Sequence, residues 1–213
     1  MKKKLNIKGL LKDLAVILAG IMVTSFGSKL LFNSTLGVAP IFMVDEGICK
    51  CFHVSLGTAI WIVCVIFLLL GLILDRHSIG LATVVSSLVS GVFIDFWELF
   101  IPVAPDSFPI QLTYMLAGVV LSSLGAAIYL HPGRGGSCTE IIMLCISRKT
   151  GISIGVARMI SDGLWFALGW ALGGTWGLGT LASLTLSGGV LQFGLKCLDR
   201  LQKVPQKNKA SIE

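Results

Sequence analysis

Charged residues are scarce in this chain. Only 13% of its 213 residues are Asp, Glu, Lys or Arg, whereas 54% are hydrophobic, and the mean hydropathy is +0.88. This scarcity excludes an ordinary soluble domain, whose surface needs many more charges. The formal net charge of +6 gathers mainly in Met1–Lys12 and Lys196–Lys209, where it is typical of a topology signal. We therefore expect the lipid bilayer, and no nucleic acid, as a partner.

Motifs of enzymes and metal sites are also missing. The sequence has no G-x-S-x-G, no H-E-x-x-H, no Walker A and no dinucleotide-binding fingerprint. Its six cysteines show no C-x-x-C spacing and its three histidines are scattered, which disfavours a zinc site or a disulfide framework. We expect no enzymatic activity, no catalytic residue, no cofactor and no metal ion.

Long apolar runs are what the chain does have. Several approach the roughly 20 residues that a membrane-spanning helix needs. We predict an all-α polytopic membrane protein, with a single membrane domain over residues 1–213, in the bacterial plasma membrane. The six predicted spans cover residues 14–32, 57–74, 79–100, 111–130, 152–172 and 177–195. Two shorter segments, 40–52 and 137–149, are predicted to be helices that are either re-entrant or interfacial.

The two halves of the sequence resemble each other. Leu18–Gly27 reads LAGIMVTSFG and Leu116–Gly125 reads LAGVVLSSLG, 98 residues later. The same offset aligns further glycines and serines in one order along the chain, so we interpret the sequence as a tandem duplication. Repeat one covers residues 13–100 and repeat two covers residues 111–197.

Three spans per repeat predict an inverted-topology pair. An odd number of crossings makes the second copy enter the membrane from the opposite side. With the N-terminus inside, almost all Lys and Arg residues outside the spans fall on the inner side, as the positive-inside rule requires. The basic tails, residues 1–12 and 198–213, are therefore expected in the cytoplasm.

Two glycine-rich turns are the first candidate binding elements. Each precedes a short predicted helix, and exposed N–H groups at a helix N-terminus attract anions. Glu140 lies in the first turn of the second short helix, where an acidic side chain suits the helix dipole. The predicted substrate-binding residues in and after these turns are Gly37, Pro40, Arg134, Gly135, Gly136 and Glu140.

Ionisable residues within the spans are the second candidates, because they are costly in a bilayer. Arg158 and Asp162 lie four residues apart on one predicted helix, so they share a face and can pair. The sequence leaves open whether they line a cavity or form a purely structural ion pair. Lys29 and Asp95 complete the predicted set. Lys29 either pairs with Asp95, Asp45 or Glu46, or extends to the membrane surface.

Three features form a recognisable pattern, namely Gly27, the Gly-x-x-Pro turn from Gly37 to Pro40, and the Gly-Leu-x-Thr motif that opens two predicted spans. In these features the chain resembles the YczE/YyaS/YitT family of bacterial integral membrane proteins. The family pattern implies an acidic residue soon after the Gly-x-x-Pro turn. Here Phe42 stands where the second repeat has Glu140, so the chain departs from the pattern in its first half. The resemblance implies a transporter-like layout without naming a substrate.

These features favour a secondary transporter that moves a small anionic or zwitterionic solute by alternating access between inverted repeats. A substrate-binding or scaffold subunit that needs a partner, for example an ATPase module, is the alternative, and a channel is a third. Glycine-rich helices with short loops also make a homodimer possible.

Overall fold

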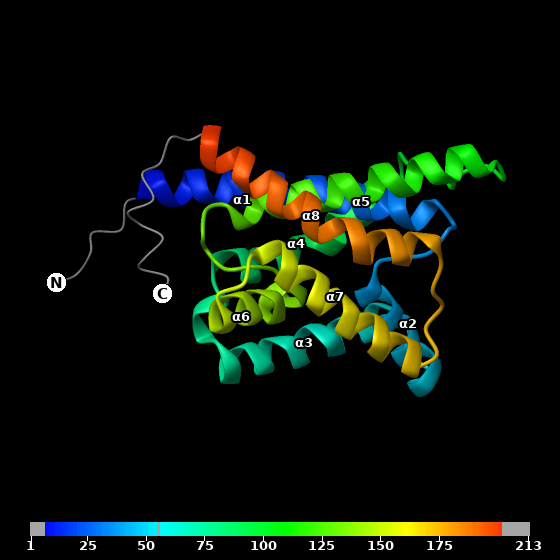
Figure 1. The fold of residues 1–213 in the computed structure, drawn as a ribbon, viewed down its shortest axis with the longest axis horizontal. Coiled ribbons are helices and arrows are strands. Elements are labelled where there is room, and N and C mark those ends of the chain that lie inside the picture. Colours follow the sequence, from blue (N-terminus) through cyan, green and yellow to red (C-terminus); the bar gives the residue numbers. More distant parts are fainter. Residues whose placement is uncertain (1–6, 55, 202–213) are drawn as a thin grey trace.

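The computed structural model describes residues 7–54 and 56–201, and these residues are all helix, turn and loop (Figure 1). The predicted basic tails therefore lie partly outside the described residues. The helices are α1 (Ile7–Asn33), α2 (Pro40–Phe52), α3 (Leu56–Leu74), η1 (Arg76–Ser78), α4 (Leu81–Glu98), α5 (Phe108–Leu130), η2 (Cys138–Glu140), α6 (Ile141–Thr150), α7 (Ile154–Ala171) and α8 (Leu178–Leu201).

Four helices are long and apolar enough to cross a membrane, namely Lys8–Asn33 of α1, α4, α5 and α8. The sequence predicted six spans. The apolar stretch of α3, Thr58–Leu74, is shorter than a full span, and α7 carries Arg158 and Asp162, which lower its hydropathy. Many large apolar side chains lie exposed on the outer helix faces, as lipid contact requires. The chain is thus an all-helical polytopic membrane protein.

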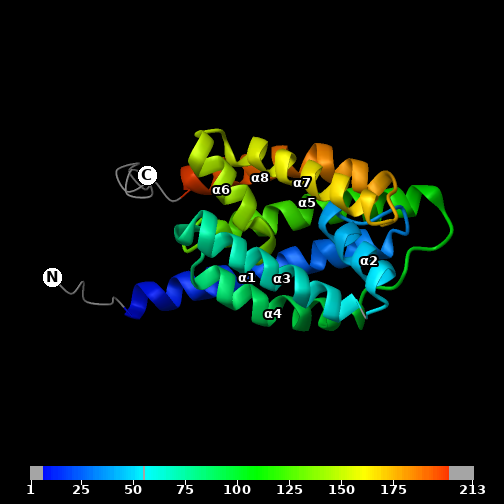
Figure 2. The ribbon, with the colours of Figure 1, turned by 90° about the horizontal axis from the view of Figure 1, so that it is seen from below.

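The centre of the fold is the antiparallel crossing of α1 and α5 (Figures 1 and 2). A Cβ on Gly118 would lie 2.8 Å from the carbonyl oxygen of Gly27, and a Cβ on Gly125 would lie 2.8 Å from that of Gly20. These distances leave no room for any side chain. Small residues at a crossing let two helix backbones touch, which is the main way helices gain packing energy in lipid.

The other helices pack around this crossing. α4 lies against α1, and α8 lies against α5. The described chain ends, Ile7 and Leu201, lie at the same end of the bundle, which we call the termini end; the opposite end is the distal end (Figures 1 and 2). The short helix α2 packs on α7 at the distal end, whereas α6 packs on α3 and α7 at the termini end.

Each glycine-rich turn docks against the start of a long helix. Gly37 has φ +122°, and the carbonyl oxygen of Leu36 before it accepts a 2.9 Å hydrogen bond from the N–H of Gly179 on α8. In the second half, the carbonyl oxygen of Arg134 accepts a 3.1 Å bond from the N–H of Ala82 on α4. The same type of contact therefore occurs twice. Leu36 in the first contact corresponds to Arg134 in the second at an offset of 98 residues, and Ala82 corresponds to Gly179 at an offset of 97.

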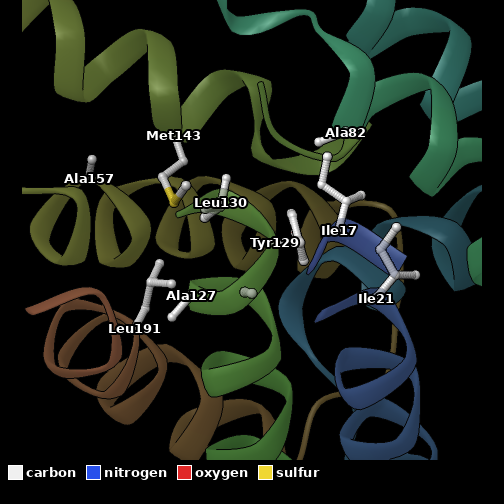
Figure 3. Packing of buried hydrophobic residues seen from close by; sticks show 10 residues of the cluster. Ile17, Ile21, Ala82, Ala127, Tyr129, Leu130, Met143, Ala157 and Leu191 are labelled. Carbon is white, nitrogen blue, oxygen red and sulfur yellow. The ribbon is translucent and has the colours of Figure 1, made fainter. Parts of the chain in front are cut away.

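The largest buried apolar cluster joins the termini-end halves of six helices, α1, α4, α5, α6, α7 and α8 (Figure 3). Ile17 of α1, Met143 of α6 and Leu191 of α8 are almost fully buried in it. Tyr129 of α5 is the only member with a hydroxyl group. This packing holds the last turns of α5 and the start of α6 in place, and both carry residues of the site described next.

Candidate functional site

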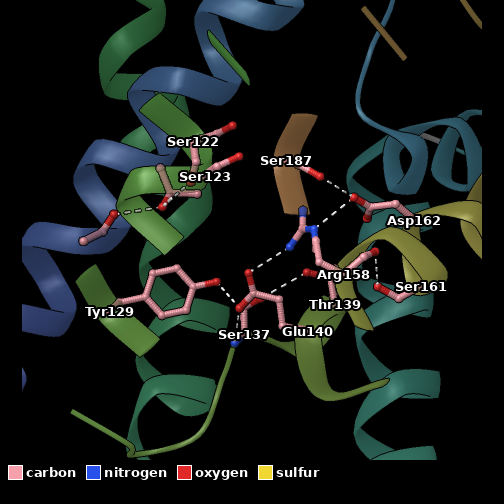
Figure 4. A network of polar contacts seen from close by, with 12 residues as sticks. Ser122, Ser123, Tyr129, Ser137, Thr139, Glu140, Arg158, Ser161, Asp162 and Ser187 are labelled. Atoms are coloured by element: carbon pink, nitrogen blue, oxygen red, sulfur yellow. Dashed lines mark hydrogen bonds and ion pairs between the residues drawn. The ribbon is translucent and has the colours of Figure 1, made fainter. Parts of the chain in front are cut away.

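Arg158 lies between two buried carboxylates (Figure 4). Its NH1 nitrogen is 3.1 Å from Oε1 of Glu140, and its Nε is 3.0 Å from Oδ2 of Asp162. Glu140 is 3% exposed and Asp162 is 4% exposed. The Arg158–Asp162 pair that the four-residue spacing predicted is therefore confirmed. Glu140, which the sequence placed in a separate turn, joins the same ion-pair group.

Both carboxylates have further hydrogen-bond donors. Oε2 of Glu140 accepts bonds from the Tyr129 hydroxyl and, at 3.2 Å, from the N–H of Ser137. Oδ2 of Asp162 accepts a 2.8 Å bond from the hydroxyl of Ser187. Four elements, α5, η2, α7 and α8, thus meet at one polar group. We call it the Arg158 cluster, and it consists of Tyr129, Ser137, Glu140, Arg158, Asp162 and Ser187.

The local sequence explains how Glu140 reaches this position. Ser137 and Glu140 have the S-x-x-E spacing of a capping box, in which the acidic side chain folds back to the N–H of the first residue. The backbone of Ser137 is extended, and Cys138–Glu140 then form one 3-10 turn that leads into α6. This spacing is a signal from which the contact between the two residues could have been predicted. Tyr129 and Ser187 carry no comparable signal, because they come from distant helices.

The charges in the cluster do not cancel. Two carboxylates face one guanidinium, so the group carries an excess negative charge when all three are ionised. Buried charges are retained only with partners, because removing them from water costs several kcal/mol per ion. A carboxylate and a guanidinium side by side can bind an ammonium group and a carboxylate group of one ligand.

The other predicted ionisable residues lie elsewhere. Arg134 pairs with Asp13, with Nε 2.8 Å from Oδ2, at the exposed termini end. Lys29 pairs with Glu98 at 3.1 Å, an exposed partner that was not among the acidic residues considered beside extension to the membrane surface. Glu98 is one helical turn beyond Asp95, and the long lysine side chain extends outward to reach it. Asp95 itself is exposed on α4.

The glycine-rich turns lie close against the backbone of other segments. A Cβ on Gly37 would lie 2.9 Å from Cα of Gly177, and one on Gly135 would lie 2.7 Å from the nitrogen of Gly80. The carbonyl oxygen of Gly136 accepts a 2.6 Å bond from Thr83.

At the start of the second short helix, the N–H of Ser137 is occupied by Glu140, so this donor is not free for an anion. Pro40 is buried as the first residue of α2. The two glycine-rich turns thus contribute no residue to the Arg158 cluster, although the sequence predicted that both groups of residues bind the same solute.

A pocket of about 450 Å³ opens at the distal end. Its lining includes Gly37 and Glu46, which come from the first turn and from α2. The complete lining is Phe32, Thr35, Leu36, Gly37, Val38, Glu46, Thr175, Trp176 and Gly177. Within the part of the chain that the structure describes, no group of three or more His, Cys, Asp or Glu residues is arranged to hold a metal ion.

Comparison with known proteins places the chain in a family. The model of a family of unknown function, DUF6198, matches residues 11–196. The chain belongs to DUF6198. Three uncharacterised relatives are similar to this DUF6198 chain. They are a Haemophilus influenzae protein (27% identity; 91% of this chain, 88% of the relative), Bacillus subtilis YczE, named a membrane protein (26%; 83% and 82%), and B. subtilis YyaS (28%; 85% and 91%).

These relatives confirm the resemblance to YczE and YyaS that the glycine motifs indicated. No solved structure matches the chain. The name of YczE and the apolar helices of this DUF6198 chain agree on membrane localisation.

Proposed function

We propose that this protein is a secondary transporter for a small zwitterionic solute, a carrier rather than an enzyme. The observation that carries the proposal is Arg158, held between Glu140 and Asp162 among apolar helices. Charged groups inside membrane helices are expensive and commonly mark a substrate or ion pathway. The guanidinium of Arg158 supplies a partner for a carboxylate group, and the carboxylates of Glu140 and Asp162 supply partners for an ammonium group. A simple anion would have to displace both carboxylates from Arg158, which makes it the less favoured substrate.

The paired contacts support two halves related by inversion. The crossing of α1 and α5 uses Gly20 with Gly125 and Gly27 with Gly118, and each of these pairs exchanges with the other under the 98-residue offset. An antiparallel crossing of matched helices is what a two-fold axis in the membrane plane produces. We infer that the chain is a pair of inverted repeats, in which α3 and α7 complete six spans.

Two polar contacts at opposite ends suggest how access could alternate. At the distal end, Nζ of Lys50 donates to the carbonyl oxygen of Gly173 at 2.9 Å; we call this contact the distal latch. At the termini end, Arg148 contacts Asp75 at 2.7 Å; this is the termini latch. Lys50 matches Arg148, and Gly173 matches Asp75, at the same offset of 98.

Each latch ties the last turn of a short helix to the connection between two long helices. Opening one latch while the other stays closed would expose the Arg158 cluster to one side of the membrane at a time. The excess of Lys and Arg at the termini end favours the cytoplasmic side for that end. Under this orientation the distal latch faces outward.

A ligand screen tests the substrate class. We would measure the thermal unfolding of the purified chain with amino acids and betaines as zwitterions, dicarboxylates as anions and polyamines as cations. A ligand that binds the folded state raises the unfolding temperature by mass action. We expect zwitterions to stabilise the protein. Stabilisation by dicarboxylates alone would overturn the proposed substrate class.

Flux measurements test the activity. Liposomes containing the protein should take up the stabilising solute, and Asp162→Asn should reduce that uptake by at least tenfold. Asp95→Asn is the matched control, because Asp95 is an exposed carboxylate outside the cluster. Binding without flux would instead indicate a subunit that needs a partner. Equal uptake by Asp162→Asn and Asp95→Asn would remove the Arg158 cluster as the site.

Labelling tests the inversion. Single cysteines at Arg76 and Val103, both exposed, would be placed in a chain without native cysteines and treated with a membrane-impermeant thiol reagent. The inverted arrangement predicts that the two positions react from opposite sides of the membrane. Reaction of both from one side would contradict it.

A further inference from the structure

Asp45 is a buried carboxylic acid with an unsatisfied oxygen. The residue lies on α2 and is 3% exposed, and its Oδ1 has no hydrogen-bond partner among the described residues. Val44 and Ile48, its neighbours on the helix, belong to a buried apolar cluster with Trp165 of α7. α2 is not among the candidate spans, yet this face of it is enclosed by protein. A polar atom left alone in such surroundings costs free energy unless the group becomes neutral or finds a partner.

The groups that face Asp45 do not supply a positive charge. α3 presents Cys64, whose thiol interacts electrostatically with Asp45 but cannot carry a positive charge. α7 carries Asp162 one turn from Trp165, and that carboxylate already binds Arg158 and Ser187. α8 also contacts α2, and its first charged residue, Lys196, lies far along that helix.

On α2 itself, the charged neighbours are directed elsewhere. Glu46 accepts a hydrogen bond of 2.9 Å from the N–H of Thr175, and Lys50 lies 2.8 Å from Oε1 of Glu46. Both side chains lie at the distal surface, whereas Asp45 points into the protein. Burial raises the pKa of the Asp45 carboxyl to about 7. An ionised Asp45 in this arrangement would be an uncompensated buried charge.

We propose that Asp45 is a proton-binding site, neutral while α2 is seated against α3 and α7 and ionised when α2 moves and admits water. The site rests on burial and on the unpaired Oδ1. Its use as the coupling proton of solute movement rests in addition on the proposed transport function. The ligand is a single proton, which leaves the carboxyl oxygen for water as α2 separates.

The distal end provides a route for that water. The pocket of about 450 Å³ is lined by Glu46, the residue next to Asp45, and by Thr175, which holds Glu46. The distal latch holds the last turn of α2 to the α7–α8 connection together with the contact of Cys51 with Leu172, so α2 separates there only when both contacts break. Water from this pocket would then reach the carboxyl group as α2 separates from the α7–α8 connection. Proton release is thereby tied to the same movement that opens the distal side.

A chemical modification experiment tests the proton site without any solute. Dicyclohexylcarbodiimide is an apolar reagent that reacts with protonated carboxyl groups in apolar surroundings and leaves a stable acylurea adduct. The folded protein in detergent would be treated at about pH 6 and about pH 9, on either side of the Asp45 value of about 7. Mass spectrometry of the peptide that holds Asp45 and Glu46 then locates the adduct on one of the two adjacent carboxyls.

We expect the adduct on Asp45 at the lower pH and at least a fivefold lower yield at the higher pH. Glu46 should carry little adduct at either pH, because it is ionised and reaches the surface. Asp45→Asn should lose the adduct, and Asp95→Asn should keep it. An unmodified Asp45 in folded protein at about pH 6, or a yield that does not change with pH, would overturn the proposal.

The assay needs neither a solute nor flux. An inactive protein that still shows the pH-dependent adduct would contradict the transport function and leave the proton site standing. An active protein without the adduct would contradict the proton site and leave the transport function standing.

Discussion

Arg148 holds both carboxylate oxygens of Asp75, with NH1 2.8 Å from Oδ1 and 2.7 Å from Oδ2. Ser78 donates a 2.6 Å bond to the same carboxylate. The termini latch is therefore a charge-assisted contact that is partly shielded from solvent. The distal latch uses a neutral carbonyl and a lysine whose side chain is 50% exposed. The two latches should differ in strength for this reason.

Breaking the termini latch should cost more stability than breaking the distal one. Arg148→Gln should lower the free energy of unfolding by about 1.5–3 kcal/mol, the range for hydrogen bonds to charged groups. Lys50→Gln should cost less than about 1 kcal/mol, as exposed pairs do. Unfolding in detergent measures both, with Lys149→Gln as an exposed control in the next position. An equal cost for the two latches would contradict the difference in burial.

Removing Glu140 should destabilise the protein strongly. Glu140→Ala deprives Arg158, Tyr129 and the N–H of Ser137 of their acceptor, and breaking a buried ion pair costs about 3–5 kcal/mol. Glu140→Gln keeps an acceptor oxygen and should cost less. Thermal unfolding compares both with Asp95→Asn, which should change stability by no more than about 0.5 kcal/mol. A Glu140→Ala protein as stable as Asp95→Asn would show that the cluster is not a stabilising unit.

A methyl group at the helix crossing should push α1 and α5 apart. In Gly125→Ala the new Cβ would lie 2.8 Å from the carbonyl oxygen of Gly20 and would also overlap the backbone nitrogen of Thr24. Backbone atoms cannot move aside locally, so we expect a loss of about 1–3 kcal/mol. Gly163→Ala is the control, because its Cβ would meet nothing within 4 Å. There the higher helix propensity of alanine should leave stability unchanged or improve it by up to about 1 kcal/mol.

Glu46 should make the stability of the distal end depend on pH. Burial alone would raise its pKa, but hydrogen bonds from Lys50 and Thr175 and the charge of Lys50 outweigh burial and lower the pKa below its ordinary 4.5. A lowered pKa gives a stabilising contribution that is complete above the ordinary value and is lost as the pH falls through the folded-state value.

The unfolding temperature of Glu46→Gln should accordingly fall below that of wild type at about neutral pH and converge with it in acid, as the pH falls below the ordinary value of 4.5 and through the lowered folded-state value. The measurement is the thermal unfolding of wild type and of Glu46→Gln at a series of pH values from neutral to acid. A difference that stays constant with pH would mean that ionised Glu46 adds no stability beyond what glutamine provides.

Periodicity and repetition in the sequence predict the local elements of this protein well. The apolar runs predict four of the six long helices within three residues at each end, whereas α1 begins seven residues earlier and α8 ends six residues later than predicted. The proline at position 40 predicts the start of α2. The Arg158–Asp162 pair follows from helix geometry alone, because residues four apart share a face. Such inferences succeed because they depend on neighbours in the chain.

Contacts between distant segments are less accessible to this reasoning. Lys29 has several acidic residues within reach of its helix end, and only the packing of α4 on α1 selects Glu98. Asp45 lies beside Glu46 on a short predicted helix, and nothing local in the sequence distinguishes the two carboxylates. Only the docking of α2 against α3 and α7 buries Asp45. Charge alone cannot rank such partners, because several arrangements satisfy it equally.

By itself the sequence determined that the chain is helical and apolar enough for a membrane, since these properties follow from local composition and order. Only the tertiary structure decided that Tyr129, Glu140, Arg158 and Ser187 meet, because they lie on α5, η2, α7 and α8. The physical reason is burial. A charged group removed from water must find its partners among whatever side chains the packing of the helices brings next to it.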